Sequence, residues 1–263
     1  MRVGFAANLE KEGIAGYRSE LMRLAEEAGC ACETFDDAEA LRSSEQPPEL
    51  LVVVGGDGSI LRFASASAER GVPILGVNLG RIGFLTEVGR DGFLPALSRI
   101  QKGEHRIEER MMLSCRVNGT ERANCLNDIL VFKRSFSGTV QVHIRCDDRS
   151  VGSVFCDGVI ASTPTGSTAY NLSAGGPVVT QTLDAIVVTP VCSHTLHMRP
   201  AVSSADSVWT FCVRDKGFVA ADGIKICQVT AEDCVVVTKS RLRARFVRFG
   251  EQNVFELIQQ KLS

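Results

Sequence analysis

Short apolar runs alternate with amphipathic segments over the first hundred residues of the chain. The runs predict buried strands, and apolar residues spaced three and four apart predict helices. The predicted strands are 2–6, 32–35, 50–54 and 72–77, and the predicted helices are 17–28 and 60–69. This alternation indicates a parallel, Rossmann-like sheet with right-handed crossovers. Because ligands of such sheets bind beyond the carboxyl ends of the strands, we expect a site after Val54 and Val77.

From about residue 104 the pattern changes to closely spaced strands with few helices. The predicted strands are 106–117, 128–133, 139–146, 150–162, 185–190, 207–213, 218–221 and 234–239. Their density indicates a β-rich, sandwich-like second domain. The sequence therefore predicts an α/β domain over 1–103, a β-rich domain over 104–240 and a closing segment over 241–263.

The closing segment combines a predicted strand and a predicted helix. Its arginines are Arg241, Arg243, Arg245 and Arg248. They alternate with apolar residues, which predicts a strand with one solvated basic face. In the helix predicted over 254–262, Leu257, Ile258 and Leu262 share one face. We expect this helix to pack on a domain surface, and the first domain is the candidate.

The composition fits a well-buried core and excludes some classes of partner. Of 263 residues, 44% are hydrophobic, and the formal net charge of −2 argues against a dedicated nucleic-acid binder. No apolar run approaches the roughly 20 residues that span a bilayer, so we expect no membrane partner. The N-terminus resembles a strand and not a signal peptide. The ten cysteines are scattered without a C-x-x-C pair, so we expect reduced core residues in a cytoplasmic protein.

The most informative motif is the run from Gly55 to Ser59, which follows the strand 50–54 directly. Three glycines bracket Asp57 and let backbone N–H groups approach an anion at the start of the next helix. A carboxylate repels phosphate, so Asp57 is better suited to act on a hydroxyl or to hold a metal. The motif therefore suggests phosphoryl transfer to an alcohol.

A second polar segment, 157–176, opens with Asp157-Gly158 and is rich in small hydroxyl residues and glycines. Such a segment surrounds a polar ligand with hydroxyls and N–H groups, although a turn between strands is the simpler alternative. Its length and its glycine-rich ending favour the ligand. A third element, Asn127-Asp128, precedes a strand. Asn suits an adenine edge and Asp suits ribose hydroxyls, but alone this pair is typical of a turn.

In this order, the three elements resemble the NAD kinase family. The run from Gly55 to Ser59 matches the family's GGDG[ST] loop, and Asn127-Asp128 matches its Asn-[Glu/Asp] pair. Residues 157–170 match its long Asp-Gly…S-T-P-T-G-S-T-A-Y signature, and 77–86 agree as well. The GGDG loop occurs also in lipid kinases and phosphofructokinases, whereas the longer signature is highly specific. The resemblance covers nearly the whole chain.

The resemblance implies ATP-dependent phosphorylation of the 2′-hydroxyl of the adenosine ribose of NAD, which gives NADP. The family's catalytic aspartate corresponds to Asp57, which would deprotonate or orient that hydroxyl. The phosphate loop would comprise Gly55, Gly56, Gly58 and Ser59. The residues assigned to NAD binding are Asp57, Gly58, Arg62, Asn127, Asp128, Asp157, Thr165, Thr168, Ala169, Tyr170, Asn171, Leu172 and Ser173. For Arg62, one helical turn after Ser59, a solvated helix position is the alternative.

The implied partners are NAD and ATP, together with a divalent cation, for which we expect Mg²⁺. This ion would bridge the donor phosphates and keep most of its waters, and the sequence contains no obvious set of protein ligands for it. The resemblance also implies a homodimer or homotetramer. One departure is Asp222-Gly223-Ile224, where many members have Asp-Gly-Gln or Asp-Ser-Gln. Any contact made by that glutamine is missing here.

Two alternative functions are compatible with parts of the sequence. A lipid or sphingoid kinase shares the GGDG loop but needs an apolar acceptor site, for which residues 162–170 are too polar. A dinucleotide-binding regulator without turnover would keep the pocket, but it has no need of the carboxylate of Asp57.

Overall fold

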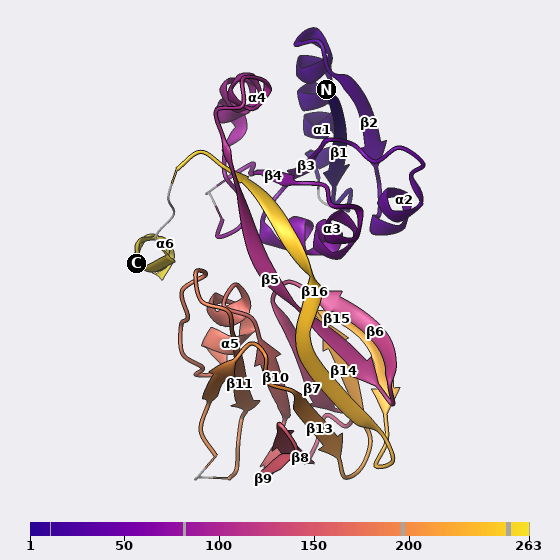
Figure 1. Cartoon of the computed structure of the whole chain (residues 1–263), viewed down its shortest axis with the longest axis vertical. Coiled ribbons are helices and arrows are strands. Elements are labelled where there is room, and N and C mark those ends of the chain that lie inside the picture. Colours follow the sequence, from indigo (N-terminus) through magenta and orange to yellow (C-terminus); the bar gives the residue numbers. More distant parts are fainter. Residues whose placement is uncertain (11, 81–82, 196–197, 251–253, 263) are drawn as a thin grey trace. The chain divides into compact units, whose positions relative to one another are not determined.

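The computed structural model describes residues 1–10, 12–80, 83–195, 198–250 and 254–262. It divides into two compact units (Figure 1). The first unit comprises Met1–Arg110 and Arg243–Ser263, and the second is Met111–Leu242. Two long strands, β5 (Arg106–Val117) and β16 (Cys234–Arg248), have residues in both units.

The first unit is built on a parallel sheet with the strand order β2-β1-β3-β4. Its strands are β1 (Arg2–Ala7), β2 (Ala31–Phe35), β3 (Leu50–Val54) and β4 (Ile74–Val77). The end of β16 extends this sheet, because Phe246 pairs in parallel with Ile74. Every residue of β3 and β4 is buried, as expected for central parallel strands. Loops that follow these two strands carry the polar residues of the site.

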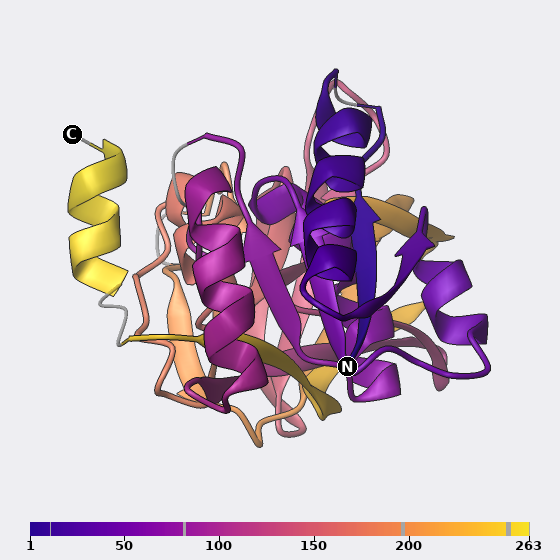
Figure 2. The same cartoon turned by 90° about the horizontal axis from the view of Figure 1, so that it is seen from above.

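Helices cover both faces of this sheet. On one face, α1 (Ile14–Glu27) and α4 (Phe93–Gln101) lie over the strands (Figure 2) and share a core with alternate residues of β1, β3 and β4. On the other face lie α2 (Ala38–Ser43) and α3 (Asp57–Arg70). There Gly76 of β4 makes room for α3, because a Cβ atom at Gly76 would stand 2.6 Å from Ile60 Cδ1.

The second unit is a β-sandwich with a large apolar core between two sheets. One sheet is antiparallel, with the order β12-β11-β10-β7-β14-β15. Its strands are β7 (Asp128–Lys133), β10 (Gly158–Ser162), β11 (Ala185–Val191), β12 (Ala201–Ser204), β14 (Gly217–Ala221) and β15 (Ile224–Val229). The other layer contains β6 (Thr120–Cys125), β8 (Val140–Cys146), β9 (Arg149–Cys156) and β13 (Trp209–Val213), with parts of β5 and β16.

The remaining elements are short. They are the 3₁₀ turns η1 (Arg90–Gly92) and η2 (Gly166–Thr168), and the helices α5 (Tyr170–Ser173) and α6 (Val254–Leu262). Within the described ranges, no helix is both long enough and apolar enough to cross a bilayer.

The α/β fold and the β-rich fold are confirmed, but several elements differ from the predicted ones. The sequence did not predict α2, α4, β6, β12 or β15. The strands β6 and β12 are half exposed and rich in polar residues, and in the edge strand β15 apolar residues are interrupted by Lys225 and Gln228, so none of the three has the continuous apolar run that reveals a buried strand. The single strand predicted over 150–162 is wrong. It consists of β9 and β10, which belong to different sheets and are separated at Asp157.

The prediction that all cysteines are reduced is also wrong. Cys212 and Cys234 form a disulfide between β13 and β16. The two residues stand directly opposite each other in the antiparallel register, with their Cα atoms 4.7 Å apart, within the range that a disulfide spans. Because the two cysteines are 22 residues apart in the chain, this pairing could not be predicted from the sequence. The other eight cysteines are free.

Candidate active site

Asp57 is the first residue of α3, immediately beyond the carboxyl end of β3. The chain turns sharply before it, because Gly55 has a φ angle of +128°, where a side chain is strained. A Cβ atom at Gly55 would also stand 2.5 Å from Ser59 Oγ. The positive end of α3 favours the Asp57 carboxylate and, equally, an anionic ligand at the same helix turn. The helix thus begins earlier than the apolar pattern predicted.

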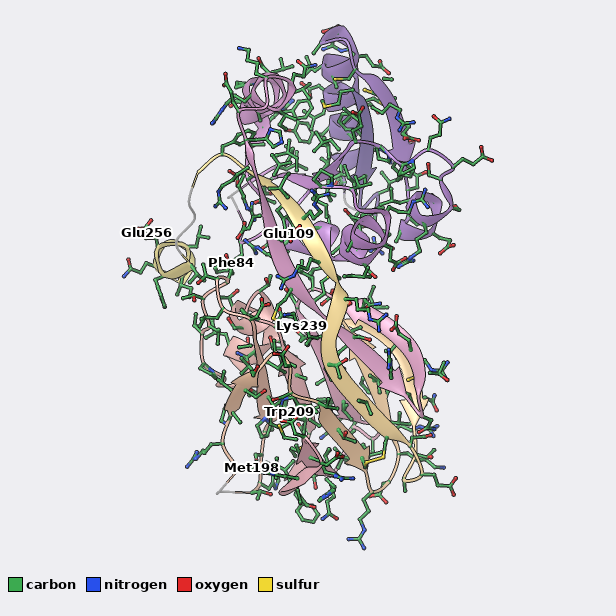
Figure 3. All side chains as sticks on the ribbon, in the orientation of Figure 1. Phe84, Glu109, Met198, Trp209, Lys239 and Glu256 are labelled. Carbon is green, nitrogen blue, oxygen red and sulfur yellow. A yellow bond between two sulfur atoms is a disulfide. The ribbon has the colours of Figure 1, made fainter. Side chains whose placement is uncertain are left out.

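The loop after β4 holds the Asp57 carboxylate on both oxygens. The backbone N–H of Phe84 (labelled in Figure 3) donates to Oδ2 at 2.9 Å, and that of Leu85 donates to Oδ1 at 2.9 Å. Residue 83 must be glycine for this approach, because a Cβ atom there would stand 2.0 Å from Oδ1. The two backbone donors therefore fix the orientation of the carboxylate.

Arg62 lies one turn along α3 and is engaged by the loop after β1. Its Nη1 donates to Asn8 Oδ1 at 2.5 Å, and its Nη2 lies 3.7 Å from a Glu10 carboxylate oxygen. The side chain is 45% exposed. Within the described residues, the Arg62 side chain is bound to the loop after β1 and not to Asp57.

Two arginines are buried beside Asp57 in the first unit. The guanidinium carbons of Arg110 and Arg248 each lie 5.2 Å from the centre of the Phe246 ring, and both groups donate to Glu108. Burial, and then the charge of Arg248, lower the pKa of Arg110 to about 10, whereas the charges of Glu108 and Asp57 oppose that shift. The predicted solvated basic face is therefore wrong for Arg248, whose side chain is 0% exposed.

In the second unit, the Asn127-Asp128 turn packs against the start of the hydroxyl-rich segment. Thr163 donates from its N–H to Asn127 O at 2.8 Å and from its Oγ1 to Leu126 O at 2.6 Å. Gly166 lies so close that a Cβ atom would stand 2.2 Å from Asn127 O. Two predicted elements that are distant in sequence are thus joined by backbone contacts.

Asp222 supports this turn, and the sequence analysis treated it only as part of a departure from the family. Asp222 and Gly223 have positive φ angles of 46° and 79° and form the two-residue turn between β14 and β15. The Asp222 carboxylate accepts from the N–H groups of Leu126 at 2.8 Å, Asn127 at 2.7 Å and Asp128 at 3.2 Å. An Asp-Gly pair between two apolar runs is a strong hairpin signal, but it gives no hint of this second role.

Asp128 and Asp222 form a buried pair of carboxyl groups. Burial, and then the charge of Asp222, raise the pKa of Asp128 to about 7. Burial also raises the pKa of Asp222 to about 6, although its three backbone donors act in the opposite direction. Because those donors favour the charged form of Asp222, we assign the negative charge to Asp222 and the proton to Asp128.

The hydroxyl-rich segment folds into η2 and α5, with most of its side chains turned into its own loop. Thr165 is buried, and Thr168 Oγ1 donates to Thr165 O at 3.3 Å. Asn171 is 0% exposed and its amide is used internally, because Nδ2 donates to Ser167 O and Pro177 O, and Oδ1 accepts from Thr189 Oγ1. Ala169, Leu172 and Ser173 continue this short helical stretch.

Tyr170 is exposed and Asp157 is half-buried. Tyr170 is 39% exposed, and burial of its hydroxyl, followed by the charges of Cys192, Asp157 and Asp128, raises its pKa. Asp157 lies at the far end of β10 from Asp128 and forms an ion pair with Lys133 at 2.6 Å. Tyr170 is therefore within electrostatic reach of both aspartates.

Comparisons with known proteins cover both units. Residues 29–105 match the family model "ATP-NAD kinase N-terminal domain" and 126–249 match "ATP-NAD kinase C-terminal domain". An NAD kinase of Moorella thermoacetica is 36% identical, with 99% of this chain and 89% of that protein aligned. An NAD kinase of Heliobacterium modesticaldum is 41% identical over 84% of this chain and 81% of that protein.

A solved structure supports the same relationship. An NAD kinase from Archaeoglobus fulgidus in complex with ATP superposes with a TM-score of 0.82 at 28% sequence identity, covering 98% of this chain and 99% of that chain. The match extends through both units and not only through the α/β part.

A parallel sheet whose glycine loop presents a carboxylate, followed by a β-sandwich with a hydroxyl-rich loop, defines a phosphotransferase with an alcohol group as acceptor. The chain belongs to the NAD kinase family. It is therefore an enzyme that phosphorylates NAD, which confirms the predicted family and class. The lipid-kinase and regulatory alternatives are set aside.

Proposed function

We propose that the chain transfers the terminal phosphoryl group of ATP to the 2′-hydroxyl of the adenosine ribose of NAD, and that Asp57 orients and deprotonates that hydroxyl. The observation that carries this proposal is the fixed carboxylate at the start of α3, held by the N–H groups of Phe84 and Leu85. A general base must be positioned within hydrogen-bond reach of the proton that it removes. The two backbone hydrogen bonds hold the Asp57 carboxylate in one orientation, as a general base requires.

The glycine loop is proposed to hold the transferred phosphate. Gly55, Gly56, Gly58 and Ser59 surround the first turn of α3, where N–H groups and the helix dipole stabilise negative charge. Phosphoryl transfer requires alignment and charge neutralisation more than covalent assistance, and a helix start supplies both. Arg62, one turn further along α3, is proposed to offset donor phosphate charge.

The second unit is proposed to bind the dinucleotide. Asn127 and Asp128 are held by Asp222 and suit the adenine edge and the ribose hydroxyls. Thr165, Thr168, Ala169, Tyr170, Leu172 and Ser173 are proposed to line the adenine pocket, and Asp157 the nicotinamide side. We assign Asn171 a supporting role within this loop, because its amide is already bonded on three sides.

We propose that Mg²⁺ binds together with ATP, the phosphate donor. Among the described residues, no three His, Cys, Asp or Glu side chains come together as a metal site. We propose that the donor phosphates and water supply most of the ligands of this cation. When bound, Mg²⁺ would neutralise charge on the phosphates, and the chain's own contribution is the alignment of Asp57.

We further propose a cytoplasmic homo-oligomer. Large apolar side chains of the second unit are exposed, with Phe136 at 103% and Ile224 at 57%, and such residues are suited to contacts between copies. Light scattering coupled to size exclusion would distinguish a dimer or tetramer from the 28.4 kDa monomer.

The proposal is tested by incubating the protein with ATP, Mg²⁺ and NAD and measuring NADP with an NADP-specific dehydrogenase. We expect Asp57→Asn to lower kcat by about a hundred- to ten-thousand-fold, with the KM for NAD little changed. Asp91→Asn, at an exposed aspartate of the same unit, serves as the control and should match the wild type. Substantial turnover by Asp57→Asn would remove Asp57 from the proposed role.

A further inference from the structure

Arg248 is a buried cation at the end of the chain's last strand. It is the final residue of β16, and its side chain is 0% exposed, on the same face of the strand as the buried Phe246. A buried guanidinium is costly unless its donors are matched, so its partners indicate why it is there.

Those partners come from two separate segments of the first unit. Nε donates to a Glu108 carboxylate oxygen at 2.6 Å, and Nη1 donates both to Glu87 Oε2 at 2.9 Å and to the backbone oxygen of Leu85 at 3.2 Å. Glu87 also accepts from the N–H of Phe249 at 2.8 Å. These hydrogen bonds attach the end of β16 to the loop that follows β4.

The Leu85 residue links Arg248 to Asp57. Its carbonyl oxygen accepts from Arg248, and its N–H donates to Asp57 Oδ1 at 2.9 Å. The neighbouring N–H of Phe84 holds the other carboxylate oxygen. Two hydrogen bonds through one residue therefore connect a side chain at residue 248 with a carboxylate at residue 57.

The contact set requires arginine. The planar guanidinium reaches a carboxylate with Nε while Nη1 reaches a second carboxylate and a carbonyl. A lysine ammonium keeps the charge but is a point donor on a flexible stem, so it does not reproduce this fork. Arg248→Lys would thus keep a positive charge beside Glu87 and Glu108 but weaken the hydrogen bond to the carbonyl oxygen of Leu85.

We propose that Arg248 is a positioning residue for phosphoryl transfer, acting through Leu85 to hold the Asp57 carboxylate in its reactive orientation. This inference rests on the proposed role of Asp57. A small misplacement of a reacting group costs up to about a hundredfold in rate, so the effect belongs in kcat and not in the affinity for NAD.

The test compares Arg248→Lys with Arg245→Lys. Arg245 is on the same strand and also donates to a backbone oxygen, that of Gly71 at 3.0 Å, but Gly71 ends α3 whereas Asp57 begins it. We expect Arg248→Lys to lower kcat about ten- to a hundredfold, with KM for NAD and for ATP within about twofold. Arg245→Lys should stay within about twofold in kcat. Circular dichroism selects an assay temperature at which all variants are folded.

A double-mutant cycle with Asp57→Asn separates positioning from general damage. If Arg248 acts through Asp57, adding Arg248→Lys to Asp57→Asn should lower the residual rate by less than about threefold, because coupled residues are not additive. The proposal would be overturned if the decrease in kcat of the double variant equalled the product of the decreases in the two single variants. So would a loss in Arg248→Lys no greater than that in Arg245→Lys.

Amide hydrogen exchange of residues 84–87 gives a readout that does not depend on activity. Arg248→Lys should lower the protection of the Phe84 and Leu85 amides, and Arg245→Lys should leave it at the wild-type level. Unchanged protection in Arg248→Lys would overturn the proposed link. If the wild type formed no NADP while the exchange pattern followed this expectation, the proposed function would fail and the structural link would stand.

Discussion

Gly83 lies against the Asp57 carboxylate so closely that a Cβ atom at residue 83 would stand 2.0 Å from Oδ1. The adjacent N–H groups of Phe84 and Leu85 reach both carboxylate oxygens only because the backbone approaches this far. The orientation of the proposed catalytic group is thus a property of two loops that follow neighbouring parallel strands.

Gly83→Ala should therefore displace Asp57 and lower kcat by at least about tenfold. The matched control is Gly80→Ala in the same loop, where a Cβ atom meets nothing within 4 Å. Steady-state rates of NADP formation for the two variants give the comparison. Equal rates would mean that the close approach of Gly83 is not needed for turnover.

The Asp222 carboxylate should matter for NAD binding although it belongs to a hairpin turn. Asparagine tolerates the positive φ angle of residue 222, so Asp222→Asn should not strain the backbone. Its NH₂ group would, however, face a backbone N–H donor, which should lower the free energy of unfolding by about 1–3 kcal/mol. We expect a higher KM for NAD and a lower urea midpoint. The fluorescence of Trp209, the single tryptophan and a core residue of the second unit, reports that midpoint (Figure 3). Asp148→Asn, in the exposed turn between β8 and β9, should change neither quantity.

Asp128 should make the stability of the second unit depend on pH. Its pKa is raised to about 7 in the folded chain, above an unfolded value of about 3.9, so the folded state binds the proton more tightly. The stabilisation is complete below pH 4 and is lost as the pH rises through 7. Relative to Asp128→Asn, the wild type should lose about 2 kcal/mol of unfolding free energy between pH 5 and pH 7. Urea titrations followed by Trp209 measure this difference, and parallel curves would contradict it.

The disulfide between Cys212 and Cys234 should stabilise the second unit. A cross-link that closes a loop of 22 residues removes unfolded-state entropy worth about 3 kcal/mol. Dithiothreitol should therefore lower the urea midpoint of the wild type. The double variant Cys212→Ser, Cys234→Ser should start from the lower midpoint and show no response to the reductant. The expected contribution would be contradicted if the urea midpoint of the wild type did not change after thiol labelling had shown that Cys212 and Cys234 were reduced.

Local patterns predicted a large part of this protein. The apolar run 50–54 and the glycines around Asp57 could be interpreted without any tertiary contact. A continuous apolar run predicts a buried strand, and glycine permits a positive φ angle. The same holds for Asn127-Asp128 at the start of β7 and for the hydroxyl-rich residues 163–176 that follow β10. The resemblance to the family rests on these short motifs, and the comparisons confirm it.

Tertiary structure alone decided how those motifs are held. The N–H donors to Asp57 come from residues 84 and 85, the donors to Asp222 from residues 126–128, and the partner of Cys212 from residue 234. Arg248 shows the reason most clearly. Strict alternation places Arg248 on the strand face of the buried Ala244 and Phe246, opposite Arg241, Arg243 and Arg245. Which carboxylates balance its charge on that buried face depends on the segments that the fold brings against it.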